Sequence, residues 1–145
     1  MAVDISLIKK LSCFQGLTKD KLDAISQISN SVCYLPGHIL FEQGQKGETL
    51  YFLIDGDVEV LFKSAYTDPR RVDMISGAEL VGCSAMVPPY TYKATEQCLT
   101  EVEVLEIELE ALRNLIEKYP QIGLKMQEHV IKILYDRILH FRHQI

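Results

Sequence analysis

The spacing of apolar residues changes twice along the chain and divides it into three parts. In residues 1–30, apolar positions such as Leu22 and Ile25 recur at helical spacing. From residue 31 to residue 107 the period becomes two, and Gly and Pro separate the short apolar segments. Residues 108–145 return to helical spacing. The pattern therefore predicts N-terminal helices, then β-strands, then C-terminal helices, which is the order of an α+β fold.

The middle part predicts short antiparallel strands joined by tight turns. Apolar residues alternate or cluster around residues 32–34, 39–41, 50–54, 58–62, 72–75 and 102–107. Asp55-Gly56 is a strong hairpin signal, because such a turn needs residues that tolerate positive φ. Strands this short and this closely spaced favour a sandwich or barrel over a parallel sheet.

The C-terminal part predicts two helices. The first covers residues 108–118 and stops before Pro120, because the residue before a proline disfavours helical geometry. The second covers residues 121–145 and carries two apolar stripes. One stripe has heptad spacing and consists of Ile131, Leu134, Ile138, Phe141 and Ile145; the other consists of Ile122, Met126, Val130 and Ile133. We expect one stripe to pack on the domain and the heptad stripe to form a homodimer.

Composition narrows the class of protein. The 145 residues suit one domain, and a net charge of −5 argues against a free-standing nucleic-acid binder, which needs clustered Lys and Arg. Neither a secretory signal nor an apolar run of about 20 residues is present, so we expect a cytoplasmic protein without a membrane segment. The four cysteines form no Cys-x-x-Cys pair, which favours free thiols over a metal site.

Catalytic motifs are missing from the sequence. It contains no P-loop, no nucleophile elbow, no His-Glu-x-x-His and no dinucleotide fingerprint. We therefore expect a protein that is not an enzyme and that needs no cofactor.

Two long motifs carry a family resemblance. They are Tyr-Leu-Pro-Gly-His-Ile-Leu-Phe-Glu-Gln-Gly at residues 34–44 and Leu-Tyr-Phe-Leu-Ile-Asp-Gly-Asp-Val-Glu-Val at residues 50–60. With Gly47 and Gly77 they resemble the cyclic nucleotide-binding domain, found in catabolite activator protein and in the regulatory subunit of cyclic-AMP-dependent protein kinase. The resemblance implies a jelly-roll-like antiparallel β-barrel flanked by N-terminal helices and two C-terminal helices.

The resemblance also implies a single domain over residues 1–145 with a phosphate-binding cassette. The N-terminal helices cover about residues 1–30, the barrel covers 31–107 with the cassette at 77–95, and the C-terminal helices cover 108–145. In the family, a short helix begins after a Gly-Glu pair in the cassette, and an Arg follows. The helix N-terminus and the Arg bind the cyclic phosphate, and the Glu accepts from the ribose.

Both chemical anchors of the cassette are changed in this chain. With Gly82 on the family glycine, Cys83 stands at the Glu position and Tyr92 at the Arg position. Lys93 follows Tyr92 on a strand and so is expected to face away. A rival register places Glu79 at the acid position. The ligand-binding residues implied by the first register are Val81, Gly82, Cys83, Ser84, Ala85, Tyr92, Lys93, Ala94 and Thr95.

Three functions remain open from the sequence. The first is a regulatory module that binds a small ligand, with cAMP and cGMP as candidates, and signals through the C-terminal helix by a hinge near Tyr119-Pro120. The alternative is a degenerate domain that no longer binds cyclic nucleotide and acts as a dimerisation or protein-interaction module. The third is a redox or haem sensor that uses Cys83 or a histidine; the candidate histidines are His38, His129, His140 and His143.

The resemblance bears on partners as well. Transcription factors of this family carry a helix-turn-helix after the long C-terminal helix, and this sequence stops within or just after that helix. We therefore expect a stand-alone domain with no direct DNA binding, a homodimer through Ile131, Leu134, Ile138 and Phe141, and a protein partner of unknown identity.

Overall fold

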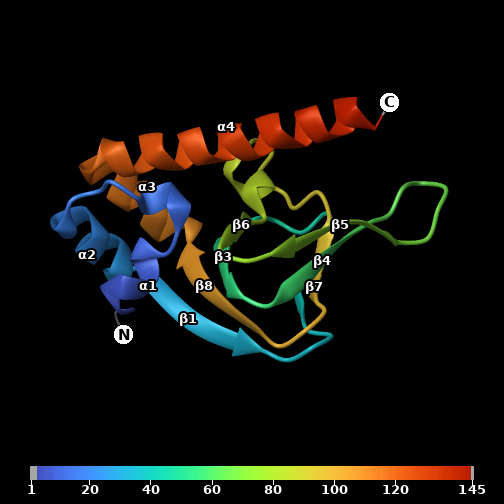
Figure 1. The fold of residues 1–145 in the computed structure, drawn as a ribbon, viewed down its shortest axis with the longest axis horizontal. Coiled ribbons are helices and arrows are strands. Elements are labelled where there is room, and N and C mark those ends of the chain that lie inside the picture. The colour runs from blue at the N-terminus through green and yellow to red at the C-terminus, as the bar shows by residue number, and fades with distance from the viewer. Residues whose placement is uncertain (1–2, 145) are drawn as a thin grey trace.

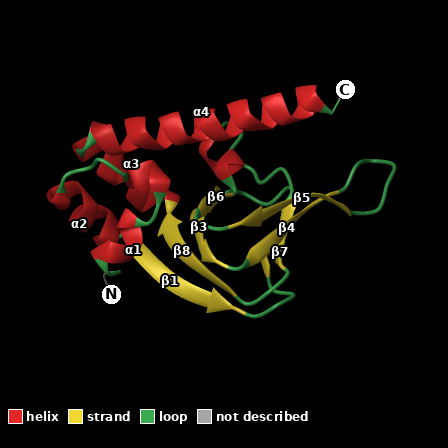
Figure 2. Ribbon diagram, in the orientation of Figure 1, coloured by secondary structure: helices red, strands yellow, loops and turns green. Residues whose placement is uncertain are grey.

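Two antiparallel sheets face each other and helices gather along one side of them (Figures 1 and 2). A computed structural model describes residues 3–144. The helices are α1 (Ile5–Lys9), the 3₁₀ turn η1 (Ser12–Phe14), α2 (Lys19–Gln27), the 3₁₀ turn η2 (Cys83–Met86), α3 (Leu109–Lys118) and α4 (Pro120–His143). The strands are β1 (Ser29–Tyr34), β2 (Ile39–Phe41), β3 (Thr49–Asp55), β4 (Asp57–Phe62), β5 (Arg70–Ser76), β6 (Glu79–Val81), β7 (Thr95–Cys98) and β8 (Val102–Glu108).

The sheet topology confirms the expected jelly-roll-like α+β fold. One sheet has the strand order β1-β8-β3-β6 and the other β2-β7-β4-β5. The hairpin predicted at Asp55-Gly56 joins β3 to β4, with Gly56 at a φ of +100°. Strands β6 and β7 were not predicted, because they are three and four residues long and β7 is mostly polar.

Aromatic and aliphatic side chains from both sheets and the N-terminal helices form one core. Phe14 of η1 lies against Phe52 of β3, with ring centroids 5.2 Å apart. Leu50, Leu53 and Leu105 are fully buried beside them. Burial of these side chains on both sides of the sheet fixes the helices against the barrel.

The helix boundaries differ slightly from the expected ones. Thr18 takes the N-cap position of α2, but its side chain makes no capping hydrogen bond. Helix α4 begins at Pro120 itself, because proline has no N–H to lose in the first turn. No helix of residues 3–144 is long and apolar enough to cross a membrane.

Helix α4 lies across one side of the molecule and uses its two stripes differently (Figure 1). Ile122, Met126 and Ile133 are buried against the domain. The heptad stripe is exposed: Ile131, Leu134, Ile138 and Phe141 are 47% to 70% exposed, although Phe141 also lines the cavity between α4 and β5. Ile145, the last residue of that stripe, lies outside the described residues.

Candidate functional site

The cassette contains a sharp turn between β6 and η2. Gly82 adopts a left-handed conformation, with a φ of +77°, and η2 follows as a single 3₁₀ turn. Val81 and Ala85 are buried, whereas Cys83 and Ser84 are half-buried. The structure thus brings the first five predicted residues together. It gives them a turn of four residues instead of a longer helix, so the aligned peptide dipoles are few.

Tyr92 fills the space beside Gly82 together with Phe41. The Tyr92 side chain is only 4% exposed and its ring stacks on Phe41, with centroids 3.8 Å apart. A Cβ added at Gly82 would lie 3.0 Å from the Phe41 ring and 3.2 Å from the Tyr92 ring. The Tyr92 hydroxyl donates to the carbonyl oxygen of Thr49 at 2.5 Å. Tyr92 therefore has a packed, hydrogen-bonded position within the core.

The remaining predicted residues turn outward. Lys93 is exposed, as expected from its place next to Tyr92, and its Nζ donates to Thr91 Oγ1 at 2.8 Å. Thr95 Oγ1 accepts from the backbone N–H of Gln43 at 2.9 Å. Ala94 lies between them and is half-buried.

The thiol of Cys83 does not have the environment of a reactive cysteine. Burial raises the pKa of Cys83, whereas a redox sensor needs a thiolate at neutral pH. His38 stacks on Tyr34, with centroids 4.0 Å apart. Within the described part of the chain, no group of three His, Cys, Asp or Glu side chains is placed to hold a metal ion.

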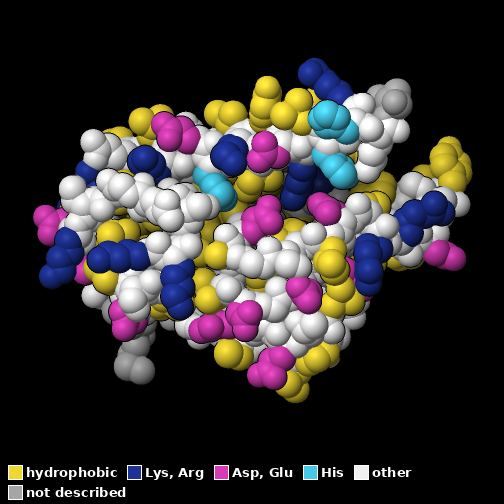
Figure 3. Space-filling view, in the orientation of Figure 1, with side chains coloured by type: hydrophobic (Ala, Val, Ile, Leu, Met, Phe, Trp, Pro, Cys, Tyr) yellow, Lys and Arg dark blue, Asp and Glu magenta, His cyan; other side chains and the backbone are white. Residues whose placement is uncertain are grey.

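A cavity of about 470 Å³ opens between β5 and the C-terminal half of α4. Figure 3 shows acidic, basic and histidine side chains gathered around the hollow beneath this helix. Its lining consists of Val72, Asp73, Met74, Ile75, Glu79, Ile133, Asp136, Arg137, His140, Phe141 and Gln144. None of the nine ligand-binding residues predicted from the first register is among them. Glu79, the acid of the rival register, lines the cavity, and burial raises its pKa.

Glu96 is a buried carboxyl that sequence reasoning missed. It lies on β7, is 5% exposed, and its Oε2 has no hydrogen-bond partner. Burial raises its pKa to about 8, and the charges of Arg137, Asp73 and Glu79 act on it. A signal for it exists in the sequence: Glu96 alternates with the buried Cys98 in a segment now known to be a strand, and a charged residue at such a position is unusual.

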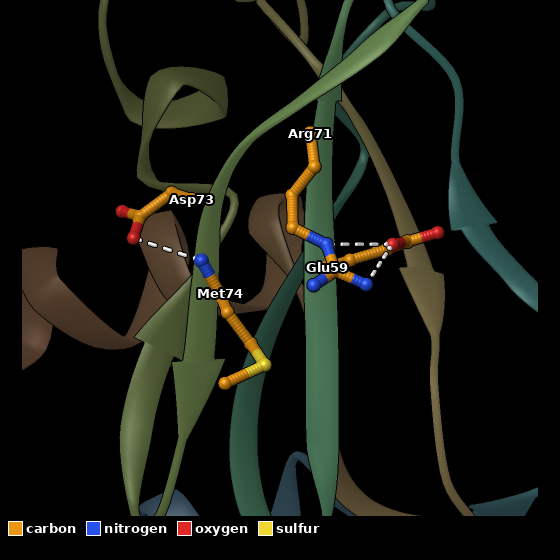
Figure 4. Close-up of polar contacts among 4 residues, drawn as sticks. All are labelled: Glu59, Arg71, Asp73 and Met74. Carbon is orange, nitrogen blue, oxygen red and sulfur yellow. Dashed lines mark hydrogen bonds and ion pairs between the residues drawn. The ribbon is translucent and has the colours of Figure 1, made fainter.

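Asp73 connects the sheet to α4. Arg137 Nη2 lies 3.9 Å from Asp73 Oδ2, and Asp73 Oδ1 also accepts from the N–H of Met74 at 2.8 Å. Figure 4 shows that the neighbouring Arg71 pairs instead with Glu59, at 2.9 Å. The carboxylate of Glu59 thus has a close guanidinium partner. At the cavity, Asp73 has the longer contact with Arg137, and Asp136 pairs with Lys132 at 3.5 Å.

Comparison with known proteins gives a family and a fold. The family model of the cyclic nucleotide-binding domain matches residues 31–119. A CRP-like cAMP-activated global transcriptional regulator of Mycobacterium tuberculosis is 22% identical over 132 residues, which is 91% of this chain and 57% of the regulator. The cGMP-dependent protein kinase egl-4 of Caenorhabditis elegans is 25% identical over 77% of this chain and 15% of the kinase. The chain thus spans less than two thirds of either relative.

Solved structures share the architecture. A putative cyclic nucleotide-binding protein from Geobacter metallireducens superposes with a TM-score of 0.81 at 23% identity, over 94% of this chain and 98% of that one. The catabolite activator protein of Thermus thermophilus gives 0.77 at 20% identity, over 92% of this chain and 62% of that one. Likeness at this identity shows the fold alone.

Proposed function

The chain belongs to the cyclic nucleotide-binding domain family, and from this premise we propose that it is a non-catalytic regulatory module. It binds a small ligand in the cavity beneath α4 and signals through that helix. One observation carries the proposal: α4 is both a wall of the cavity and the carrier of an exposed apolar stripe. A ligand in the cavity therefore contacts the same helix that offers a surface to a partner.

The two halves of α4 are held unequally, which suits a signalling element. Near its start, Ile122 and Met126 are buried, and Gly123 packs so closely that an added Cβ would lie 2.8 Å from Ile116 Cγ2. Beyond Ile133 no residue of the helix, within the described part, is buried. Ligand contacts with the second half can then shift it about the anchored first half, near Tyr119-Pro120.

Cyclic nucleotides are the first ligands to test, because the relatives named above include a cAMP-activated regulator and a cGMP-dependent kinase. Calorimetric titration of the full chain with cAMP and with cGMP, up to millimolar concentration, measures binding directly. Heat with a defined stoichiometry supports a cyclic nucleotide as the ligand. Absence of heat and of any thermal shift with both would exclude cyclic nucleotides for this chain.

The output of the module is a homodimer through the heptad stripe of α4. Leu124 stands seven residues before Ile131 and is also exposed, so the apolar stripe extends by one heptad toward the start of α4. Light scattering coupled to size-exclusion chromatography should give a dimer for the native chain and a monomer for Ile131→Glu/Ile138→Glu. Tyr66→Glu, which alters a large, 97% exposed aromatic residue on the β4–β5 loop, should remain dimeric. A native monomer at all accessible concentrations would contradict this output.

The second candidate function is a degenerate domain that dimerises without any ligand. The packing of Phe41 and Tyr92 beside Gly82 favours it, because two stacked rings fill the space next to the cassette turn and Tyr92 brings no positive charge there. In this case the dimer forms as above, but its affinity does not change with any small molecule that enters the cavity.

A further inference from the structure

The barrel contains a carboxyl group without a partner. Glu96 is only 5% exposed, and its Oε2 atom has no hydrogen-bond partner. No Lys, Arg or His side chain of residues 3–144 forms an ion pair with it within 4 Å. A buried polar group in this state is costly, and natural proteins rarely keep one without use. The Glu96 carboxyl is therefore suited to accept a hydrogen bond from a ligand.

The strand register directs this carboxyl toward the cavity. Glu96 pairs with Val60 of β4, and Val60 pairs with Asp73 of β5. Residues directly opposite each other on neighbouring strands share one face of the sheet. Glu96 therefore leaves β7 on the same face of the sheet as Asp73, which lines the cavity, although Glu96 itself is not one of the lining residues. The charges of Arg137, Asp73 and Glu79, which do line it, act on the Glu96 carboxyl.

The charges around the cavity favour a cation. Three carboxyl groups line it, from Asp73, Glu79 and Asp136, against the guanidinium of Arg137 and the imidazole of His140. Lys132 is outside the lining and pairs with Asp136 at 3.5 Å, so Glu79 is the lining carboxyl without an ion pair in the described residues. Arg137 already pairs with Asp73 at 3.9 Å. A phosphate placed here would meet more negative than positive charge, and it would repel an ionised Glu96.

The walls of the cavity favour an organic body. Side chains of Ile75, Ile133 and Phe141 provide apolar surface, and the volume of about 470 Å³ is in the range of small-molecule sites. A bare metal ion does not fit this description, and the described residues provide no cluster that could hold one.

We propose that the cavity beneath α4 recognises a small organic cation, an amine or guanidinium on an apolar body, with Glu96 and Glu79 as acceptors. This inference rests on the proposed function, because it names the ligand class of the same cavity. The ammonium group donates to the unpartnered oxygen of Glu96, and the apolar body contacts Ile133 and Phe141 of α4. A bound ligand then contacts both β7 and α4, the helix that carries the heptad stripe.

The test uses matched probes on the full chain at pH 7. Tryptamine and indole-3-propionate share an indole body and differ in the charge of the side chain; spermidine is an aliphatic cation, and cAMP is the anionic family ligand. We expect tryptamine to bind at least about 10-fold more tightly than indole-3-propionate, since charged hydrogen bonds in buried sites are strong. Glu96→Gln should weaken tryptamine at least about 10-fold, and Glu117→Gln, an exposed carboxyl on α3, should not.

Release of the Glu96 proton on amine binding distinguishes direct contact with the carboxyl from an indirect structural effect of the substitution. The raised pKa of Glu96 means that the free protein holds a proton there at pH 7, and a bound ammonium group favours its loss. The heat of tryptamine binding should therefore depend on the ionisation enthalpy of the buffer, and this dependence should vanish in Glu96→Gln.

Three outcomes would overturn the cation assignment. They are no response to either amine, equal binding of tryptamine and indole-3-propionate, and unchanged amine affinity in Glu96→Gln. Binding of cAMP without binding of amines would overturn it while leaving the proposed ligand-binding function intact. Absence of binding by all four probes, with a dimer that persists, would remove both in favour of the degenerate domain.

Discussion

The cassette turn and the cavity beneath α4 lie close together in the chain, since Glu79 lines the cavity and Gly82, three positions later, begins the turn. They have opposite character. At the turn, Tyr92 and Phe41 fill the space and the Tyr92 hydroxyl has its partner. In the cavity, space remains open, and the Glu96 carboxyl, on the same face of the sheet as the lining residue Asp73, has no partner for Oε2. The difference teaches that a sequence motif can identify the fold of a family, while the polar group without a partner lies elsewhere in the same chain.

The largest expected change in stability comes from removing the aromatic ring of Tyr92, which packs beside the cassette turn. Tyr92→Ala should lower the free energy of unfolding by about 3–5 kcal/mol, because a buried aromatic is lost and a cavity remains. Urea denaturation measures the change. Tyr66→Ala, at a 97% exposed residue, should change it by less than about 0.5 kcal/mol. A fully stable Tyr92→Ala would show that Tyr92 is not a packing residue and would reopen its assignment to the ligand.

The next prediction concerns how the buried Glu96 carboxyl makes the stability of the protein depend on pH. Glu96 has a pKa raised by burial from 4.5 to about 8, so the folded state keeps a proton that the unfolded state gives up. This contribution to stability is complete below about pH 4.5 and is lost as the pH rises through about 8. Glu96→Gln should therefore be more stable than the native chain above pH 8, by about 1–3 kcal/mol.

Chemical denaturation at pH 5, 7 and 9 provides the measurement for Glu96. Glu117→Gln serves as the exposed control and should follow the native curve. Parallel pH profiles of the native chain and Glu96→Gln would mean that Glu96 is not an uncompensated buried acid, and the contrast between the two regions would disappear.

An effect of similar size tests how tightly the cassette turn is packed. A Cβ at Gly47 would lie 2.3 Å from Ala85 Cβ and 2.7 Å from Ala85 Cα. Gly47→Ala should therefore cost about 1–3 kcal/mol, as overpacking does. Ala85→Gly in the same chain should recover part of the loss, because it removes the nearest atom. An additive double variant in thermal unfolding would contradict direct contact between the two residues.

The smallest effect concerns the ion pair over the cavity. The side chains of Arg137 and Asp73 are 46% and 48% exposed, so Asp73→Asn should cost no more than about 1 kcal/mol. The cost should shrink in 0.5 M salt because screening weakens exposed pairs. Thermal unfolding at low and high salt measures it. A larger, salt-independent cost would mean that Asp73 supports α4 by more than this charge pair.

Much of the fold could be predicted from local signals. The hairpin at Gly56 and the alternation in β4 are recorded in adjacent residues, and so is the break at Pro120. Strand β7 could not be predicted so well, because its four residues are mostly polar and its place between β2 and β4 comes from partners far away in the chain. The two stripes of α4 were visible, but their roles depend on which face meets the barrel.

The candidate site was less predictable than the fold. Aligning the cassette identified Cys83 and Tyr92 as departures, but it could not show that the ring of Tyr92 stacks on Phe41. Glu96 drew no notice, because one carboxyl in a polar segment looks like a solvated residue until the strand register is known.

The sequence by itself determined the order of helices and strands, the turns and the family, because each of these depends on residues that are neighbours in the chain. Only the tertiary structure decided which polar groups are paired. It brought Tyr92 to Thr49 and left Glu96 Oε2 without a partner, on the same face of the sheet as Asp73 of the cavity. The physical reason is that burial and pairing depend on distances between strands, and those distances arise only when the two sheets and α4 pack together.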